Sequence, residues 1–347
     1  MPLKAGLERV LLLLSGEHPT MTYSEICAIL DSEGMGYDAI AKHDQIFLLD
    51  VNPAAMELLG KRSAYLMEGG RLLAQCAANT EDCAKSLENI DWSFLGGKSF
   101  GARANRVRNY WRNLDTQELQ GMIGGIVKGN TDSIVNLDCP EVWIKGIISD
   151  AGVFFYIIGV STDRSGFTAR RPKSRPYFHP GVLEPKLSRA FVNLSGVREG
   201  GLFVDPFCGT GGFLIEAALM GMKACGMDLD MRMVNGTGKN VAHYHLDCDL
   251  LHGDAKALPL SAIDGISTDP PYGRGTTTMG MDAASVLLGF LRGASGALKK
   301  GGKLCTAAPI ELNPRRMAQE SGFKVIEEHQ MRVHKSLTRS IIVVERD

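Results

Sequence analysis

Apolar segments alternate with amphipathic segments throughout the second half of the chain. From Gly181 onward, short aliphatic runs predict buried strands, and apolar residues between them recur every three or four positions, as in amphipathic helices. This alternation is typical of a parallel sheet with six or seven strands, covered by helices on both faces. The expected strands lie at 202–204, 223–227, 250–251, 262–266, 303–307, 324–328 and 340–344. The expected helices lie at 185–197, 212–220, 231–243, 283–298 and 314–321.

The first 160 residues mix the two patterns less regularly. Their order of strands and helices is typical of two small α/β modules in succession. The first module is expected to contain strands at 9–14, 39–41 and 46–51, a helix at 22–31 and a short helix from Pro53. The second is expected to contain strands at 99–103, 134–137, 142–148 and 153–160 and a helix at 115–126.

Composition excludes several classes of protein. A net charge of −1 over 347 residues provides no global basic field, so any nucleic-acid surface must be local. Eight cysteines without a C-x-x-C pair argue against a zinc ribbon or a disulfide framework, and favour a reducing cytoplasm. The apolar run from Val10 to Leu14 is too short to span a membrane and lacks the features of a signal peptide.

Two basic segments are candidates for phosphate contact. Residues 103–112 contain four arginines and two aromatic residues without an acid, which suits RNA binding; a solvated cationic edge is the alternative. Residues 161–180 contain three prolines, which limit regular structure, and a run of basic residues; a purely structural spacer is the alternative there. The expected RNA-binding residues in these segments are Arg103, Arg106, Arg108, Arg112, Arg170, Arg171 and Arg175.

A glycine-rich loop follows the first strand of the large sheet, with the sequence V-D-P-F-C-G-T-G-G-F at 204–213. Glycines let the backbone approach a ligand, and doubly wound sheets bind cofactors at this edge. Asp228 and Asp254 follow the next two strands, where carboxylates can meet ribose hydroxyls and an adenine amino group. An adenosine-containing cofactor is therefore predicted, although Leu214 replaces the third glycine of nicotinamide sites. The expected cofactor-binding residues are Asp205, Phe207, Cys208, Gly209, Thr210, Gly211, Asp228, Leu229, Asp254 and Ala255.

The segment S-T-D-P-P-Y-G at 267–273 follows the fourth strand. Its prolines forbid a helix, so a rigid corner displays the carboxylate of Asp269, the carbonyl of Pro270 and the ring of Tyr272. These groups suit the exocyclic amine of a planar base, held and stacked for reaction. An ordinary turn with a solvated aspartate is the alternative. Arg274 is a further candidate for phosphate contact, or else an exposed surface arginine.

No metal site is predicted. His243, His245, Cys248 and His252 straddle a boundary between a helix and a strand, so their side chains are not expected to converge.

These motifs resemble those of Rossmann-type amino-methyltransferases that use S-adenosylmethionine. The matching segments are D-P-F-C-G-T-G-G-F at 205–213, G-M-D-L-D at 226–230, H-G-D-A at 252–255 and D-P-P-Y-G at 269–273. The whole chain is similar to the archaeal tRNA guanine-10 2-amino-methyltransferases, including R-P-Y-F-H-P-G at 175–181 and V-H-K-S-L-T-R at 333–339. In order and size, the first 160 residues look like that family's ferredoxin-like and THUMP modules.

The resemblance implies four parts: a ferredoxin-like module at 1–70, a THUMP module at 71–160, a linker at 161–180 and a methyltransferase domain at 181–347. It implies S-adenosylmethionine as cofactor and tRNA as partner. Asp269, Pro270 and Tyr272 would hold a flipped guanine, and Asp269 would orient its 2-amino group. A cytoplasmic monomer is expected. The number of methyl groups added, and the need for a small activating subunit, stay open.

Two other functions stay open at this stage. One is an adenine 6-amino-methyltransferase acting on DNA or another RNA, since such enzymes share D-P-P-Y. The other is a non-catalytic RNA-binding protein with a vestigial methyltransferase fold.

Overall fold

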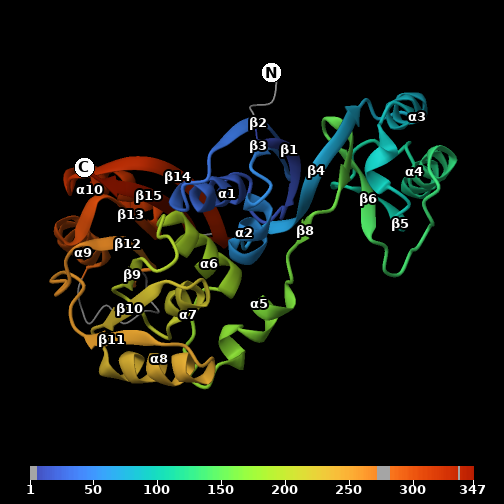
Figure 1. Cartoon of the computed structure of the whole chain (residues 1–347). Helices are drawn as coiled ribbons and strands as arrows, with labels where there is room; N and C mark the ends of the chain where they lie inside the picture. The colour runs from blue at the N-terminus through green and yellow to red at the C-terminus, as the bar shows by residue number, and fades with distance from the viewer. Residues whose placement is uncertain (1–5, 272–281, 335–336) are drawn as a thin grey trace. The chain divides into compact units, whose positions relative to one another are not determined.

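The computed structural model describes residues 6–271, 282–334 and 337–347, which divide into two compact units (Figure 1). The N-terminal unit comprises residues up to 19 together with 35–61 and 66–162. The C-terminal unit comprises 20–34, 62–65 and 163–347. No helix in the described ranges is both long enough and apolar enough to cross a membrane.

Seven strands form one sheet in the described part of the C-terminal unit. They are β9 (Leu202–Asp205), β10 (Lys223–Asp228), β11 (Cys248–His252), β12 (Ile263–Thr268), β13 (Leu298–Pro309), β14 (Phe323–His334) and β15 (Leu337–Arg346). Their order is β11-β10-β9-β12-β13-β15-β14. Strands β9 to β13 pair in parallel, whereas β15 is antiparallel to both of its neighbours. This confirms the mostly parallel Rossmann-type sheet predicted from the sequence.

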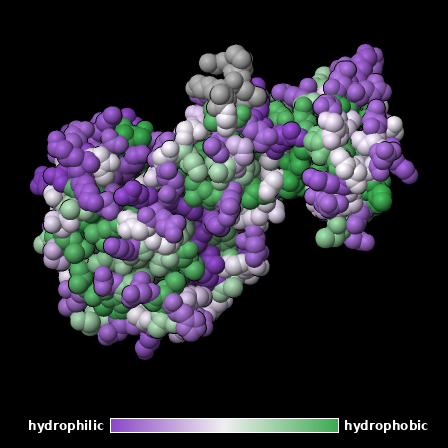
Figure 2. Space-filling view, in the orientation of Figure 1, coloured by the Kyte–Doolittle hydropathy of each residue, from purple (hydrophilic) through white to green (hydrophobic). Residues whose placement is uncertain are grey.

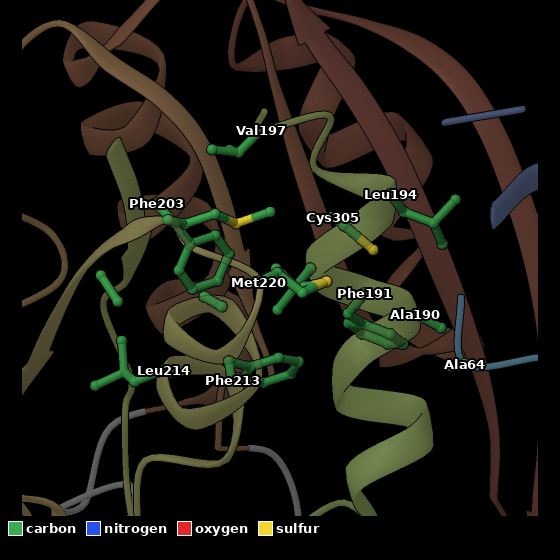
Figure 3. Packing of buried hydrophobic residues seen from close by; sticks show 14 of the residues in the cluster. Ala64, Ala190, Phe191, Leu194, Val197, Phe203, Phe213, Leu214, Met220 and Cys305 are labelled. Atoms are coloured by element: carbon green, nitrogen blue, oxygen red, sulfur yellow. The ribbon is translucent and has the colours of Figure 1, made fainter. Parts of the chain in front are cut away.

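Helices cover this sheet through two buried apolar clusters. The helices of the unit are α1 (Met21–Ser32), α5 (Ser165–Ala169), α6 (Pro185–Leu194), α7 (Gly212–Leu219), α8 (Met231–His243), α9 (Ala283–Ala297) and α10 (Pro314–Glu320). One cluster joins Phe203 of β9 to α6 and α7, and the other joins Ile266 of β12 to α9 and α10. Figure 3 shows the first cluster, where the rings of Phe191 and Phe213 lie 5.6 Å apart. Because these apolar faces are buried, the helices hold the sheet in place. The ends of the strands that carry the site therefore keep fixed positions.

The described part of the N-terminal unit contains an eight-stranded sheet. Its strands are β1 (Glu8–Leu14), β2 (Tyr37–His43), β3 (Ile46–Val51), β4 (Leu66–Cys76), β5 (Phe100–Arg106), β6 (Val142–Ser149), β7 (Gly152–Ile157) and β8 (Val160–Ser161). Their order is β2-β3-β1-β4-β7-β6-β5, with β8 paired to β4. The helices that accompany this sheet are α2 (Ala55–Arg62), α3 (Thr80–Glu88) and α4 (Thr116–Asn130).

Two details of this unit differ from the sequence-based expectation. Strand β4 continues through residue 70, so the expected boundary between two modules falls inside a strand shared by one sheet. Residues 134–137 do not form a strand, and Val135 makes only an isolated bridge to Phe100.

Helix α1 belongs to the C-terminal unit, although its sequence position placed it in the first module. Glu25 of α1 is fully buried and accepts hydrogen bonds from Ser63 Oγ (2.7 Å), Ala64 N (2.8 Å) and Asn193 Nδ2 (2.7 Å). Burial raises the pKa of this carboxyl group, and the hydrogen bonds oppose that effect. Because these partners are distant in the sequence, the local pattern could not reveal the grouping.

The expected linker is also part of the C-terminal unit, from Asp163 onward. It folds into α5 and a 3-10 turn, η2 (Pro172–Ser174), with Phe167 buried in the core. The prolines shorten its helices but do not leave the segment extended.

Candidate active site

A cavity of about 230 Å³ opens at the carboxyl ends of the parallel strands in the C-terminal unit. This is the edge where doubly wound sheets bind ligands, next to the point where the strand order reverses between β9 and β12. The cavity is lined by residues 206–210 after β9, 228–230 after β10, 254–256 after β11, Asp269 and Pro271 after β12, and 179–183 before α6. The predicted cofactor loop and the predicted catalytic corner therefore share one cavity.

Helix α8 holds the glycine-rich loop in place. Gly209 and Gly211 have φ values of 52° and 81°, which other residues adopt only with strain. Thr237 Oγ1 donates to the carbonyl oxygen of Gly209 (2.8 Å), and Asn240 Nδ2 donates to that of Thr210 (2.9 Å). Both α8 side chains are fully buried. Sequence reasoning missed them because their only signal is a polar residue on the buried face of a helix.

Asp228 connects the end of β10 to the loop. Its Oδ2 accepts from Gly209 N (2.9 Å), and its Oδ1 accepts from Asp230 N (2.9 Å). Burial raises the pKa of this carboxyl group, while the two backbone donors act in the opposite direction. Because the side chain also lines the cavity, it can accept hydrogen bonds from ribose hydroxyls.

Asp254 and Ala255 line the same cavity beyond β11. The Asp254 carboxylate also lies 3.3 Å from Lys256 Nζ. Phe207, Cys208, Thr210 and Leu229 are lining residues too, whereas Gly211 is not among them.

Asp205 lies beneath the loop instead of at the cavity surface. It is fully buried, and its Oδ1 accepts from Thr268 Oγ1 (2.7 Å) and Phe207 N (3.2 Å). Its Oδ2 has no hydrogen-bond partner among the described residues. The carboxyl group thus ties the glycine loop to the end of β12, next to Asp269. Burial raises its pKa to about 8.

Replacing Asp205 with asparagine is expected to change how stability depends on pH. In the native protein the carboxyl group keeps its proton up to about pH 8, whereas the unfolded chain releases it near pH 4. The native state therefore binds more protons between these values, and its stability falls as pH rises through this window. Asparagine is neutral at all these pH values. As pH rises from 5 to 8, the free energy of unfolding of the variant should therefore increase by at least about 1 kcal/mol relative to that of the parent protein. Urea denaturation at both pH values measures this, and parallel pH curves would contradict it.

The described part of the catalytic corner places Asp269 beside an arginine from the C-terminal hairpin. Arg339 Nη1 donates to Asp269 Oδ2 at 3.3 Å, and the two side chains are only 12% and 14% exposed. Arg339 lies on β15, opposite Pro309 of β13. Sequence reasoning quoted Arg339 within the hairpin but gave it no role, because its position depends on the order of the strands. Pro270 is buried, and Tyr272 and Arg274 lie outside the described residues.

The arginines of the N-terminal unit are in different environments. Arg103 stacks over the Trp143 ring at 4.2 Å, and Arg108 pairs with Asp44 at 2.5 Å. Arg106 donates to backbone carbonyl groups of residues 110, 111 and 114, so it supports a loop and is not presented to RNA. Arg112 is exposed, and the neighbouring Trp111 is 47% exposed. Hydrophilic residues cover much of α3 and α4 in the view of Figure 2.

The arginines of residues 161–180 do not form the basic contact surface that was predicted from the sequence. Arg175 is only 5% exposed, and Arg170 donates to the buried carboxylate of Glu216 (2.8 Å). Neither guanidinium can reach an RNA backbone from these positions. Arg171 remains exposed, with Glu184 at 3.7 Å.

The arrangement can hold an adenosine group and places the carboxylate of Asp269 in the same cavity. Within the described ranges, no group of three or more His, Cys, Asp or Glu side chains could hold a metal ion.

Comparisons with known proteins agree with this geometry. Residues 172–341 match the family model of an RMKL-like methyltransferase domain. The chain is 38% identical over 340 residues to a tRNA (guanine(10)-N2)-dimethyltransferase of Methanothermobacter thermautotrophicus, covering 97% of this chain and 99% of the relative. A protein of the same name from Methanocaldococcus jannaschii is 32% identical, with coverage of 96% and 99%.

Among solved structures, TrmN from Thermus thermophilus superposes with a TM-score of 0.55. It covers 98% of this chain and 100% of its own, at 20% sequence identity. At this identity the likeness shows the fold alone, and it extends over both units.

Proposed function

The chain belongs to the tRNA (guanine(10)-N2)-dimethyltransferase family, and we propose that it methylates the 2-amino group of guanosine 10 in tRNA. The observation that carries this proposal is the shared cavity. Asp228 and Asp254 occupy the side suited to adenosine, and Asp269 lies on the wall formed by β12. S-adenosylmethionine would supply an activated methyl group, so the protein itself needs to position the acceptor amine and stabilise developing charge.

Asp269 would orient the acceptor amine. Arg339 engages Oδ2 of this carboxylate and holds the side chain against the wall of the cavity. A carboxylate oxygen held in this way can accept a hydrogen from the amine. A guanine amine has two hydrogens, and it keeps one after the first methylation. The same carboxylate oxygen can therefore orient the amine for a second transfer, which supports dimethylation at a single site. Because Asp269 lines the cavity and is only 14% exposed, the target base must leave its helical stack to reach it.

The N-terminal unit would bind tRNA through its exposed basic and aromatic side chains. Arg103 and Arg112 are exposed, and Trp111 offers a surface for stacking. Arg106 and the two buried arginines near α7 are not part of this proposed surface.

The proposal is tested with the purified chain, unmodified tRNA and methyl-labelled S-adenosylmethionine. Label is expected in N2-methylguanosine and N2,N2-dimethylguanosine at position 10. The matched control is the same tRNA with inosine at position 10, because inosine lacks only the 2-amino group. Label in the inosine tRNA, or in adenosine, would overturn the guanine assignment. Activity of the purified chain alone would show that no activating subunit is required.

The same assay tests the proposed RNA surface. Replacing Arg112 with alanine should raise the KM for tRNA without changing the affinity for S-adenosylhomocysteine. An unchanged KM would remove Arg112 from the proposed surface.

A further inference from the structure

Two walls of the cavity are joined by one buried side chain that does not itself line the cavity. Asp205 and Thr268 are both fully buried, and Thr268 Oγ1 donates to Asp205 Oδ1 at 2.7 Å. The same oxygen accepts from Phe207 N at 3.2 Å. Phe207 belongs to the glycine-rich loop along the cavity, and Thr268 directly precedes Asp269. One carboxyl oxygen therefore contacts both the proposed cofactor loop and the proposed catalytic corner.

The backbone does not hold these two walls together at this level of the sheet. Among the described residues, β9 and β12 pair only as far as Val204 and Ile266. On its other side, β12 pairs with β13 as far as Thr268 and Thr306. The hydrogen bond between the side chains of Asp205 and Thr268 therefore takes the place of backbone pairs where the strand order reverses.

This arrangement costs stability, so stability alone does not explain it. Asp205 Oδ2 is buried and has no hydrogen-bond partner in the described part of the chain, and burying an unpaired polar atom is unfavourable. Burial raises the pKa of Asp205 to about 8, and the negative charges of Asp228 and Asp269 add to this effect. Near neutral pH the group thus keeps its proton and adds no third negative charge to the site. Proteins accept such local costs mainly where function requires them.

We propose that Asp205 is a positioning residue for methyl transfer, which acts through Thr268 to fix the location of Asp269 relative to the cofactor loop. The inference rests on the proposed function. Methyl transfer needs the acceptor amine in line with the donor carbon, and a displacement of about 1 Å can slow such a reaction about 100-fold. Arg339 holds the Asp269 side chain from β15, whereas Asp205 holds the preceding residue from β9.

The test removes the hydroxyl group that connects the two walls. Thr268→Val keeps the shape of the side chain and should lower the single-turnover rate of methyl transfer about 10-fold to 100-fold at saturating tRNA and cofactor. Its affinity for S-adenosylhomocysteine, measured by calorimetric titration, should stay unchanged. Thr268→Ser restores the hydroxyl group and should recover most of the rate. Asp205→Asn keeps a neutral group with an acceptor oxygen, so its rate at pH 7 should stay close to that of the parent protein.

Thr306→Val is the matched control. Thr306 is fully buried at the same register on β13, and its Oγ1 has no hydrogen-bond partner among the described residues. Removal of this hydroxyl group should leave the rate of methyl transfer unchanged. If Thr268→Val does not fold, Thr268→Ala removes the same hydroxyl group with less bulk and should give the same loss of rate.

Several results would overturn the inference. Equal slowing by Thr268→Val and Thr306→Val would indicate a general effect of packing. A loss of S-adenosylhomocysteine affinity that matches the loss of rate would indicate a role in cofactor binding instead. If Asp205→Asn is as slow as Thr268→Val, a neutral side chain at this position is not sufficient. A parent protein that transfers no methyl group to tRNA would refute the proposed function, and the inference with it.

Discussion

Replacing Asp269 with asparagine is expected to lower the rate of methyl transfer about 100-fold to 1000-fold. Arg339 donates to Oδ2 of the aspartate, so an asparagine would turn its amide oxygen toward the arginine. Its NH2 group would then face the acceptor amine, and two donors would oppose each other. The rate is measured in single turnovers at saturating tRNA and cofactor, so that weaker binding does not enter the result.

A double variant separates this explanation from simple loss of charge. With Arg339→Gln added, the amide at position 269 is no longer held in one orientation, and part of the lost rate should return. The affinity for S-adenosylhomocysteine should stay close to that of the parent protein in both variants. A double variant as slow as the product of the two single effects would show that Arg339 does not orient residue 269.

The second large effect is expected from Glu216→Gln, as a loss of about 3–5 kcal/mol in the stability of the C-terminal unit. The glutamate is fully buried and receives three hydrogen bonds from Arg170 and Arg189. A neutral amide would leave both guanidinium groups without a buried counterion. Because all three tryptophans, Trp92, Trp111 and Trp143, lie in the N-terminal unit, their fluorescence does not report on this loss. Far-UV circular dichroism in urea is the suitable measurement.

The control is an exposed ion pair in the same unit. Glu320 pairs with Arg316 on α10 at 2.7 Å, and the two side chains are 51% and 74% exposed. Glu320→Gln should change stability by no more than about 0.5 kcal/mol. An equal loss of stability in the two variants would show that the contribution of Glu216 to stability does not depend on the burial of its carboxylate.

The large sheet and the positions of the candidate site residues along its edge were predictable because their signals are local. A strand, a glycine loop and a helix follow one another directly around Gly209, and the two prolines after Asp269 force a corner whatever surrounds them. Placing Asp228 and Asp254 at this edge also required only the rule that the carboxyl ends of parallel strands meet at a common edge.

The remaining features depend on contacts between distant segments. Arg339 reaches Asp269 only because β15 lies beside β13, an order that hydrophobic pattern does not encode. Arg175 was interpreted as a surface cation because charged residues in a proline-rich segment are usually solvated. Its burial depends on the packing of α7, because a side-chain carbon at Gly212 of that helix would lie 3.5 Å from Arg175 Nη1. Strand β4 was not predicted, since its two glycines and its arginine interrupt the apolar pattern.

The grouping of α1 with the C-terminal unit has a consequence for biosynthesis. Asn193 follows Glu25 by 168 residues, so the helix leaves the ribosome long before the side chain that pairs with its carboxylate. The methyl-transferring half cannot finish folding from its own contiguous segment, and closing so long a loop slows the final assembly. A shortened gene that starts at the conventional domain boundary would therefore lose a helix of the domain it was meant to isolate.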